Sequence, residues 1–406
     1  MKNGNLRRLA LIWGALMIAV ISSTTTLLVS SRAGRGEGES RRWVTQAEYD
    51  TIQRYSRLDE VRQTLLKDYY KELDEDALVL GAIRGMTGSV EDPYTFYYTP
   101  EELKRENEDT AGVYFGIGTL LQNTAEGEIE IVRVFPNSPA EAAGVHVGDV
   151  ILAVDGNAVT GVDGRSYLEA VRRMRGGENT QVTLTVRRNG ERIAIPVTRG
   201  DVRISYASYQ VLPGNIGYIN ISQFSGDASR VFHEAIDAFR AQGVEGLVID
   251  LRNNPGGLLE QAVSIADAVL PKGLIVYTKQ RDGSRQDYWS DAACFDVPLA
   301  VLVNDMSASA SEILAGSVQA LGRGVVVGLT TYGKGVVQSL QTFQADNAGI
   351  QLTTASYYDA LDRCPQEVGV QPDVEVALEG DAPPLEPDPA SDNQLAEAIA
   401  RLKPED

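Results

Sequence analysis

The sequence is poor in the two residue types that carry most metal and thiol chemistry, since its 406 residues include only two cysteines and two histidines. Cys294 and Cys364 stand in no CxxC pair and beside no histidine, which argues against metal ligation and thiol catalysis. In an exported protein they form a disulfide or stay as buried thiols, and the sequence leaves this open. We therefore expect no metal and no other cofactor.

Histidine is also absent from the places where a catalytic base is most often found. His146 lies in a short glycine-bounded segment and His233 within a helical pattern, so neither follows a predicted strand of the large sheet described below. A Ser/His/Asp triad is therefore not expected. Any catalytic serine in this chain needs a different base.

Positive charge is scarce as well. The 37 basic and 56 acidic side chains leave a formal net charge of -19. Such a chain repels phosphate backbones, so we expect no nucleic-acid partner. The length and the 43% apolar content instead allow two or three domains, each with its own core.

Only one long apolar run is present, the 21 uncharged residues from Leu9 to Val29. At 1.5 Å per residue a helix of this length spans about 30 Å, enough to cross a bilayer. Lys2, Arg7 and Arg8 precede the run and predict that the N-terminus lies inside the cell. Residues 1–30 are thus interpreted as a membrane anchor or, alternatively, a cleaved signal segment, although no clear small-x-small cleavage site follows. The remaining chain is expected outside the cytoplasm, tethered to the cell membrane.

The rest of the chain divides into regions with different sequence patterns. After a linker at 31–42, residues 43–110 have helical periodicity, and Pro100 is expected to open a new helix. Residues 111–200 hold short β-branched runs, including a hairpin at Asn189-Gly190, and predict a small, partly open barrel. Residues 201–376 alternate strand and helix, which predicts a mostly parallel sheet covered by helices. Residues 377–406 form an acidic, proline-rich tail ending in a short helix.

Ligands of parallel sheets bind at the carboxyl ends of the strands, where "RNNPGG", "NDMSAS" and "TTYGKG" lie. Ser309 and Glu312 form a capping box for the helix that follows, and this alone explains a serine there. The same position also suits a nucleophile, because the N–H of Ala310 then points to where an oxyanion forms. Gly256 or Gly257 is the candidate second oxyanion donor, with a plain tight turn as the alternative.

Lys334 is the candidate base. It follows the strand "VVVGLT" at the same end of the sheet as Ser309, and burial lowers the pKa of a lysine so that its amine can accept a proton. Gln338, four residues on, is placed to orient it without adding charge. "GLTTYGKG" also has P-loop spacing, but Gly335 replaces the Ser or Thr that would hold Mg²⁺, which disfavours nucleotide binding.

These motifs together resemble the C-terminal processing peptidases, or tail-specific proteases. The resemblance rests on "DPYTFYYTPEE", "FGIG", "VGDVILAVDG", "DLRNNPGG", "SASASEI", "GKGVVQ", "TTASYY" and "GVQPDVEV". It implies a multi-domain α/β protein with an N-terminal helical region, a PDZ-like β-barrel domain and a protease core similar to the ClpP and crotonase folds. It implies Ser309 as nucleophile, Lys334 as base, Gln338 as the orienting residue, and Ala310 with a glycine of "NPGG" as the oxyanion hole. "RGGENT" and "ALDRCPQEVG" depart from the family pattern, which affects local loops.

The resemblance also implies a substrate class. The PDZ-like domain is expected to capture the free, unstructured C-terminus of an exported or membrane protein, with its carboxylate held at Phe115, Gly116, Ile117 and Gly118. The alternative is a catalytically inactive PDZ scaffold that binds such tails without cutting them. A crotonase-like acyl enzyme is less suitable, because a PDZ-like insertion has no role there. A homo-oligomer is left open.

Overall fold

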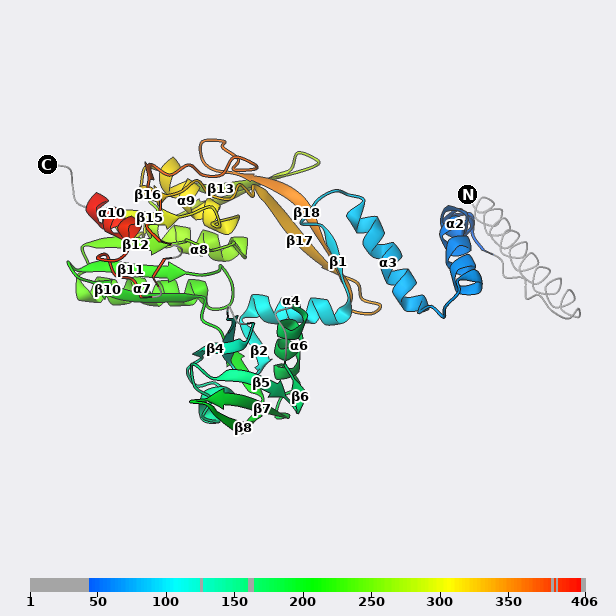
Figure 1. The fold of residues 1–406 in the computed structure, drawn as a ribbon. Coiled ribbons are helices and arrows are strands. Elements are labelled where there is room, and N and C mark those ends of the chain that lie inside the picture. Colours follow the sequence, from blue (N-terminus) through cyan, green and yellow to red (C-terminus); the bar gives the residue numbers. More distant parts are fainter. Residues whose placement is uncertain (1–43, 125–126, 160–163, 381–382, 385, 403–406) are drawn as a thin grey trace, which may run out of the picture. The chain divides into compact units, whose positions relative to one another are not determined.

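The structure is a computed structural model that describes residues 44–124, 127–159, 164–380, 383–384 and 386–402 (Figure 1). The predicted anchor at 1–30 and linker at 31–42 lie outside these residues. Across the described ranges, no helix combines the length and the apolar character that a membrane crossing requires.

The N-terminal part, up to Ala82, consists of α2 (Gln46–Asp68) and the first half of α3 (Glu75–Gly88). A capping box of Thr45 and Glu48 begins α2. No residue of α2 is buried, so its stability comes from the helix itself and from pairs along its surface. The helical pattern predicted for this region is present.

From Ile83 onward the chain forms a second compact unit. After α3 comes the short strand β1 (Phe96–Tyr98), and then α4 (Pro100–Ala111). Pro100 is the first residue of α4, as predicted, and Thr99 and Glu102 form a capping box there.

A small β-rich region follows α4. The Asn189-Gly190 hairpin is present, with φ values of 51° and 84° that match a type I' turn. The core of this β-rich region contains Ile131, Val182 and Leu184, which are fully buried. The main antiparallel sheet has the order β3-β4-β5-β7-β8, with β6 beside β5, and a separate ladder joins β2 to β9. The elements are β2 (Val113–Gly116), β3 (Thr119–Asn123), β4 (Ile129–Val134), α5 (Pro139–Ala142), β5 (Val150–Val154), β6 (Asn157–Ala158), α6 (Gly164–Met174), β7 (Gln181–Arg188), β8 (Glu191–Thr198) and β9 (Gly200–Arg203).

The largest sheet is mostly parallel, as predicted, and has the order β10-β11-β12-β15-β16-β19. Only β10 runs antiparallel to its neighbour. The register pairs Asp250 with Leu302 and Val303 with Gly328, so the carboxyl ends of β12, β15 and β16 lie side by side. Its strands are β10 (Ala207–Leu212), β11 (Ile216–Ile221), β12 (Gly246–Asp250), β15 (Leu299–Val303), β16 (Val325–Gly328) and β19 (Val374–Glu375).

Helices cover both faces of this sheet (Figure 1). One face packs against α7 (Ala228–Gln242), α8 (Leu259–Val269) and α9 (Ala310–Ala320). The opposite face packs against α10 (Asn393–Arg401), the helix predicted for the tail. Because both faces are covered, every residue of β12 and β15 is buried, and all of them are apolar except the terminal Asp250.

A second sheet, which the sequence analysis did not anticipate, lies beside the first. Its main path is β1-β18-β13-β14, and β17 also pairs with β18. The elements are β13 (Gly273–Gln280), β14 (Arg285–Ser290), β17 (Val336–Thr342) and β18 (Gly349–Tyr358). It pairs Gln338 of β17 with Thr353 of β18 and Phe96 of β1 with Gln351, so it brings residues near 95 close to residues near 338.

Cys294 and Cys364 are both free thiols in this structure, so the disulfide alternative is not formed. The fold class expected from the sequence is confirmed: a multi-domain α/β chain with helical, small β-rich and large mixed-sheet regions. The exact domain boundaries stay predictions.

Candidate active site

The loops after β12, β15 and β16 meet at one end of the large sheet, where they border a cavity of about 640 Å³. Neither His146 nor His233, both described by the structure, lines this cavity. Its lining includes five of the residues that the sequence singled out: Gly257, Ser309, Ala310, Lys334 and Gln338.

Ser309 lies at the start of α9 in a strained backbone conformation. Its φ of 53° and ψ of -112° are unusual for a residue with a side chain. The turn places Ser309 at the cavity and leaves the N–H of Ala310, the first residue of the helix, without an intrahelical partner. A strained serine beside an open N–H is a geometry suited to nucleophilic attack and oxyanion binding.

The turn at Gly256-Gly257 packs directly against this serine. A Cβ atom on Gly256 would lie 2.8 Å from the Cβ of Ser309, so no larger residue fits there. The N–H of Gly256 already donates to Asn254 Oδ1 at 2.8 Å. No described residue accepts a hydrogen bond from the N–H of Gly257, which also lines the cavity. Of the two glycines, Gly257 therefore has the available donor.

Glu312 joins the serine turn to the lysine loop. It is 1% exposed, and each of its two carboxylate oxygens accepts two hydrogen bonds. Oε2 accepts the N–H of Ser309 at 2.7 Å and the N–H of Lys334 at 2.9 Å. Oε1 accepts the hydroxyl of Thr331 at 2.6 Å and the N–H of Gly333 at 2.8 Å. From the sequence, Glu312 is expected only as a helix cap, whereas its Oε2 atom holds the backbones of Ser309 and Lys334 together.

Tyr357 on β18 makes the same connection through the carbonyl groups. Its hydroxyl lies 2.7 Å from the carbonyl oxygen of Lys334 and 3.0 Å from that of Ser309. Burial raises the pKa of Tyr357 well above its usual value, so the hydroxyl keeps its proton and donates. Residues 309 and 334 are thus held side by side from two directions.

The Lys334 side chain is partly buried, and burial lowers the pKa of its amine while Asp92 and Glu312 oppose this shift. The amine lies over the ring of Tyr94, 4.3 Å from its centroid. Among the described residues, no hydrogen bond joins the amine to the hydroxyl of Ser309, although both residues line the cavity. Gln338 Nε2 donates to Thr353 Oγ1 at 3.2 Å, and no described contact joins it to Lys334.

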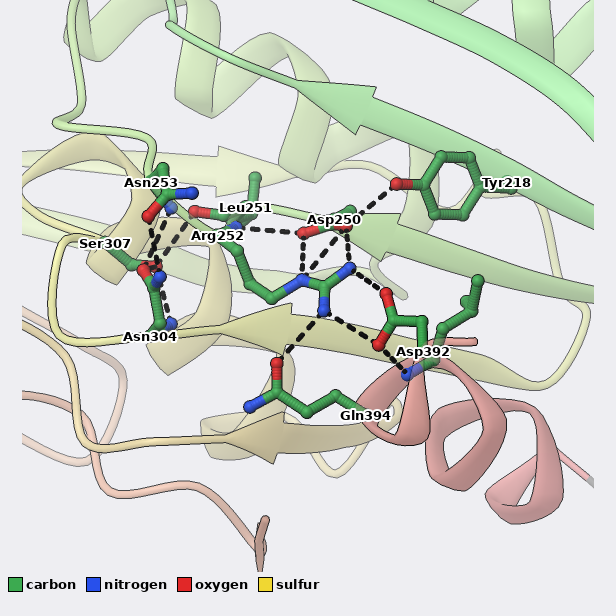
Figure 2. A network of polar contacts seen from close by, with 10 residues as sticks. Tyr218, Asp250, Leu251, Arg252, Asn253, Asn304, Ser307, Asp392 and Gln394 are labelled. Carbon is green, nitrogen blue, oxygen red and sulfur yellow. Dashed lines mark hydrogen bonds and ion pairs between the residues drawn. The ribbon is translucent and has the colours of Figure 1, made fainter. Parts of the chain in front are cut away.

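A buried charge network supports these loops from behind (Figure 2). Arg252 is 5% exposed and forms bidentate pairs with Asp250 and with Asp392, the residue that caps α10. Tyr218 donates to Asp250 at 2.8 Å, and Gln394 accepts from Arg252 at 3.0 Å. The two carboxylates outweigh burial and raise the pKa of the arginine. The network ties the loop after β12 to the C-terminal helix.

The next residues connect that loop to the serine loop. Asn253 and Asn304 exchange hydrogen bonds, with the N–H of Asn253 donating at 2.9 Å and the amide of Asn304 at 2.8 Å. Ser307 Oγ donates to the carbonyl of Leu251 at 2.8 Å. Figure 2 shows these contacts beside Arg252. The loops that carry the glycine turn and Ser309 therefore form one rigid, hydrogen-bonded unit.

Of the predicted carboxylate-binding residues, Phe115 and Gly116 are the last two residues of β2, and Ile117 and Gly118 join β2 to β3. Ile117 is buried, and its carbonyl accepts the N–H of Ala140 at 2.7 Å. The carbonyl of Gly118 accepts the N–H of Phe135 at 3.0 Å. These contacts hold the segment against β4 and α5, and its role in binding a carboxylate stays a prediction.

Comparison with known proteins matches three parts of the chain. Residues 215–376 match peptidase family S41, residues 130–188 match the PDZ domain, and residues 20–102 match the N-terminal domain of the activating protease CtpB. The second match falls within the small β-rich region, and the first covers Gly257, Ser309, Lys334 and Gln338.

Individual relatives cover most of the chain. The carboxy-terminal processing protease CtpA of Bacillus subtilis is 32% identical over 375 residues, which is 92% of this chain and 78% of that protein. A protein of Staphylococcus epidermidis described as "Probable CtpA-like serine protease" is 32% identical over 366 residues, 89% of this chain and 71% of its own length. Among solved structures, the photosystem II D1 C-terminal processing protease is 29% identical, with a TM-score of 0.49 over 82% of this chain and 94% of that one.

Proposed function

Because the chain belongs to peptidase family S41 and, within it, to the C-terminal processing serine proteases, we propose that Ser309 is its nucleophile and Lys334 its general base. One observation carries this assignment. Ser309 and Lys334 line the same cavity, and Glu312 and Tyr357 hold their backbones side by side.

In the proposed reaction, the neutral Lys334 amine takes the proton of the Ser309 hydroxyl as Oγ bonds to the scissile carbonyl carbon. The oxyanion that forms accepts hydrogen bonds from the backbone N–H groups of Ala310 and Gly257. The lysine ammonium then gives its proton to the leaving amine, and the peptide bond breaks. Water then attacks the acyl carbonyl carbon while the Lys334 amine takes a proton from it. When the ester C–O bond breaks, the lysine ammonium returns this proton to Ser309 Oγ, which frees the new C-terminus and restores both residues.

Two features of the site must change for this reaction. The Lys334 amine has to leave the Tyr94 ring and reach the serine hydroxyl, and Gln338 has to exchange Thr353 for the lysine in order to orient it. Both movements involve side chains around an existing cavity. Gln338 therefore remains the proposed orienting residue.

The substrate is a protein, as the peptidase and PDZ matches indicate. We propose that unstructured C-terminal tails of exported or membrane proteins are captured at Phe115 to Gly118 and cleaved at Ser309 by endopeptidase action. The apolar run at 9–29 supports a membrane anchor with the catalytic part outside the cytoplasm, and a homo-oligomer is compatible with this arrangement. The relatives favour this peptidase over an inactive PDZ scaffold.

Cleavage of a tailed protein is expected to increase with pH. A lysine acts as a base only after losing its proton, and burial lowers the pKa of Lys334 from its usual value of about 10.4. The rate of tail release, measured by mass spectrometry from about pH 5 to 9, should therefore rise along a single limb toward the alkaline side. A flat profile over this range would count against a lysine base.

Glu312→Gln is expected to lower kcat about a hundredfold while KM changes little. The glutamine keeps one acceptor oxygen but turns an NH₂ group toward N–H groups that now donate to a carboxylate, so Ser309 and Lys334 lose their alignment. Steady-state kinetics on a tailed substrate measure the effect. Ser317→Ala is the matched control, because Ser317 is buried on the same helix but bonds only to Leu314. Wild-type kcat in Glu312→Gln would show that the carboxylate does not align the site.

A further inference from the structure

Tyr94 lies in a tight turn just before β1. Asp92 organises this turn, since its carboxylate accepts the N–H of Tyr94 at 3.0 Å and the hydroxyl of Thr95 at 2.6 Å. Gln351 on β18 donates to the carbonyl of Tyr94 at 3.2 Å, and β1 itself pairs with β18. The backbone of Tyr94, from which the ring projects, is therefore held through both its N–H and its carbonyl group.

The ring faces the amine of Lys334. The distance of 4.3 Å from the Nζ atom to the ring centroid is within the range of a cation–π contact. Burial and the neighbouring hydroxyl of Tyr332 raise the pKa of Tyr94 to about 12, so the phenol is neutral at the pH values where the enzyme would act. The contact is thus between an ammonium group and an aromatic face.

Two carboxylates, those of Asp92 and Glu312, act on the charge of this amine. Asp92 belongs to the same turn as Tyr94 and favours the protonated lysine. Glu312 has the same effect, but its oxygens already accept four hydrogen bonds. Tyr332, Tyr357, Cys364 and Glu367 are further titratable residues in or against the lysine loop, and Glu106 and Glu260 line the same cavity.

We propose that Tyr94 is a positioning residue that holds the protonated Lys334 side chain on its ring and releases the side chain when the proton leaves. This inference rests on Lys334 as the catalytic base. A cation–π contact attracts the ammonium form and not the neutral amine. Deprotonation therefore frees the side chain to turn toward Ser309 in the same step that makes it a base.

The test is the pH profile of Tyr94→Leu. Loss of the aromatic face removes a contact that favours the protonated lysine, so the limb of the profile should move to lower pH by about one unit. At a pH on the acid side of the limb, the cleavage rate relative to the plateau then rises about tenfold. Tyr94→Phe keeps the ring and removes only the hydroxyl beside Tyr332, so its limb should stay at the wild-type pH.

Two further measurements make the result decisive. Tyr209 is exposed and does not line the cavity, so Tyr209→Leu is the matched control. This variant should leave the limb of the pH profile in place. In a Ser309→Ala background, the pH dependence of Lys334 modification by an amine-selective reagent, followed by peptide mass spectrometry, should show the same shift without any catalysis. If Tyr94→Leu folds poorly, Tyr94→Met removes the aromatic face with a more adaptable side chain and should move the limb in the same direction.

A merely structural role would lower the plateau of Tyr94→Leu and leave the limb unmoved, and that outcome overturns the inference. An unmoved modification profile does the same. The proposed function fails by a different observation, namely full activity of a variant that lacks Lys334. The two failures are therefore distinguishable in one set of variants.

Discussion

Lys334→Ala is expected to reduce cleavage of a tailed protein substrate by at least about a thousandfold, and Ser309→Ala by a similar factor. Without the amine the proposed base is lost, and neither histidine lines the cavity to replace it. The two residues act as one unit, so the double variant should be no slower than either single one. Single-turnover cleavage followed by mass spectrometry measures all three rates.

Matched controls separate this loss from general damage. Lys279→Ala removes an exposed lysine from β13, and this variant should cleave the tailed substrate at the wild-type rate. Thermal unfolding should show Ser309→Ala and Lys334→Ala folded. A serine-directed covalent probe should label the wild type and not Ser309→Ala. Full cleavage by either variant would refute the dyad, and an unlabelled, inactive wild type would favour the scaffold alternative.

Arg252→Ala is expected to destabilise the protein by about 3–5 kcal/mol. Arg252 is 5% exposed and neutralises two carboxylates, those of Asp250 and Asp392, that are 2% and 1% exposed. Its removal leaves two like charges buried and facing each other without a counter-ion. Urea denaturation followed by circular dichroism should show the loss, and α10 should lose its connection to the loop after β12.

Arg230→Ala is the matched control, because Arg230 also pairs with two carboxylates, Asp227 and Glu234, but is 61% exposed. Surface pairs of this kind contribute little, so the change should be less than about 1 kcal/mol. Equal stability of the Arg252→Ala and wild-type proteins would mean that the buried network does not hold the loops.

Local patterns predicted much of this molecule because the signals were local. Alternating strands and helices predicted the parallel sheet, Pro100 predicted the start of α4, and Asn189-Gly190 predicted a hairpin. Scarce histidine pointed to a lysine base, and the order of the motifs indicated the family. These inferences need only periodicity, turn chemistry and the rule that strand ends share one edge.

The second sheet was missed for a physical reason. "VVQSLQTF" around β17 alternates like a strand, but β14 and β17 are polar and largely exposed, so their sequences do not indicate which strands they pair with. The same sheet decides which residues flank the lysine, because β18 supplies Tyr357 and, by pairing with β1, places Tyr94. Residues more than 200 positions apart in the chain thereby share one site.

The chain's residue order accounts for the chemistry on offer: a serine at a helix start, a lysine after a strand, glycines in a tight turn and no competing histidine. Folding in three dimensions sets how those groups are held. Glu312 and Tyr357 join residues 309 and 334. Asn254 accepts the N–H of Gly256 and leaves that of Gly257 available, and the lysine amine lies over the ring of Tyr94. Contacts of this kind depend on which loops pack together, and packing between distant segments leaves no periodic trace in the sequence.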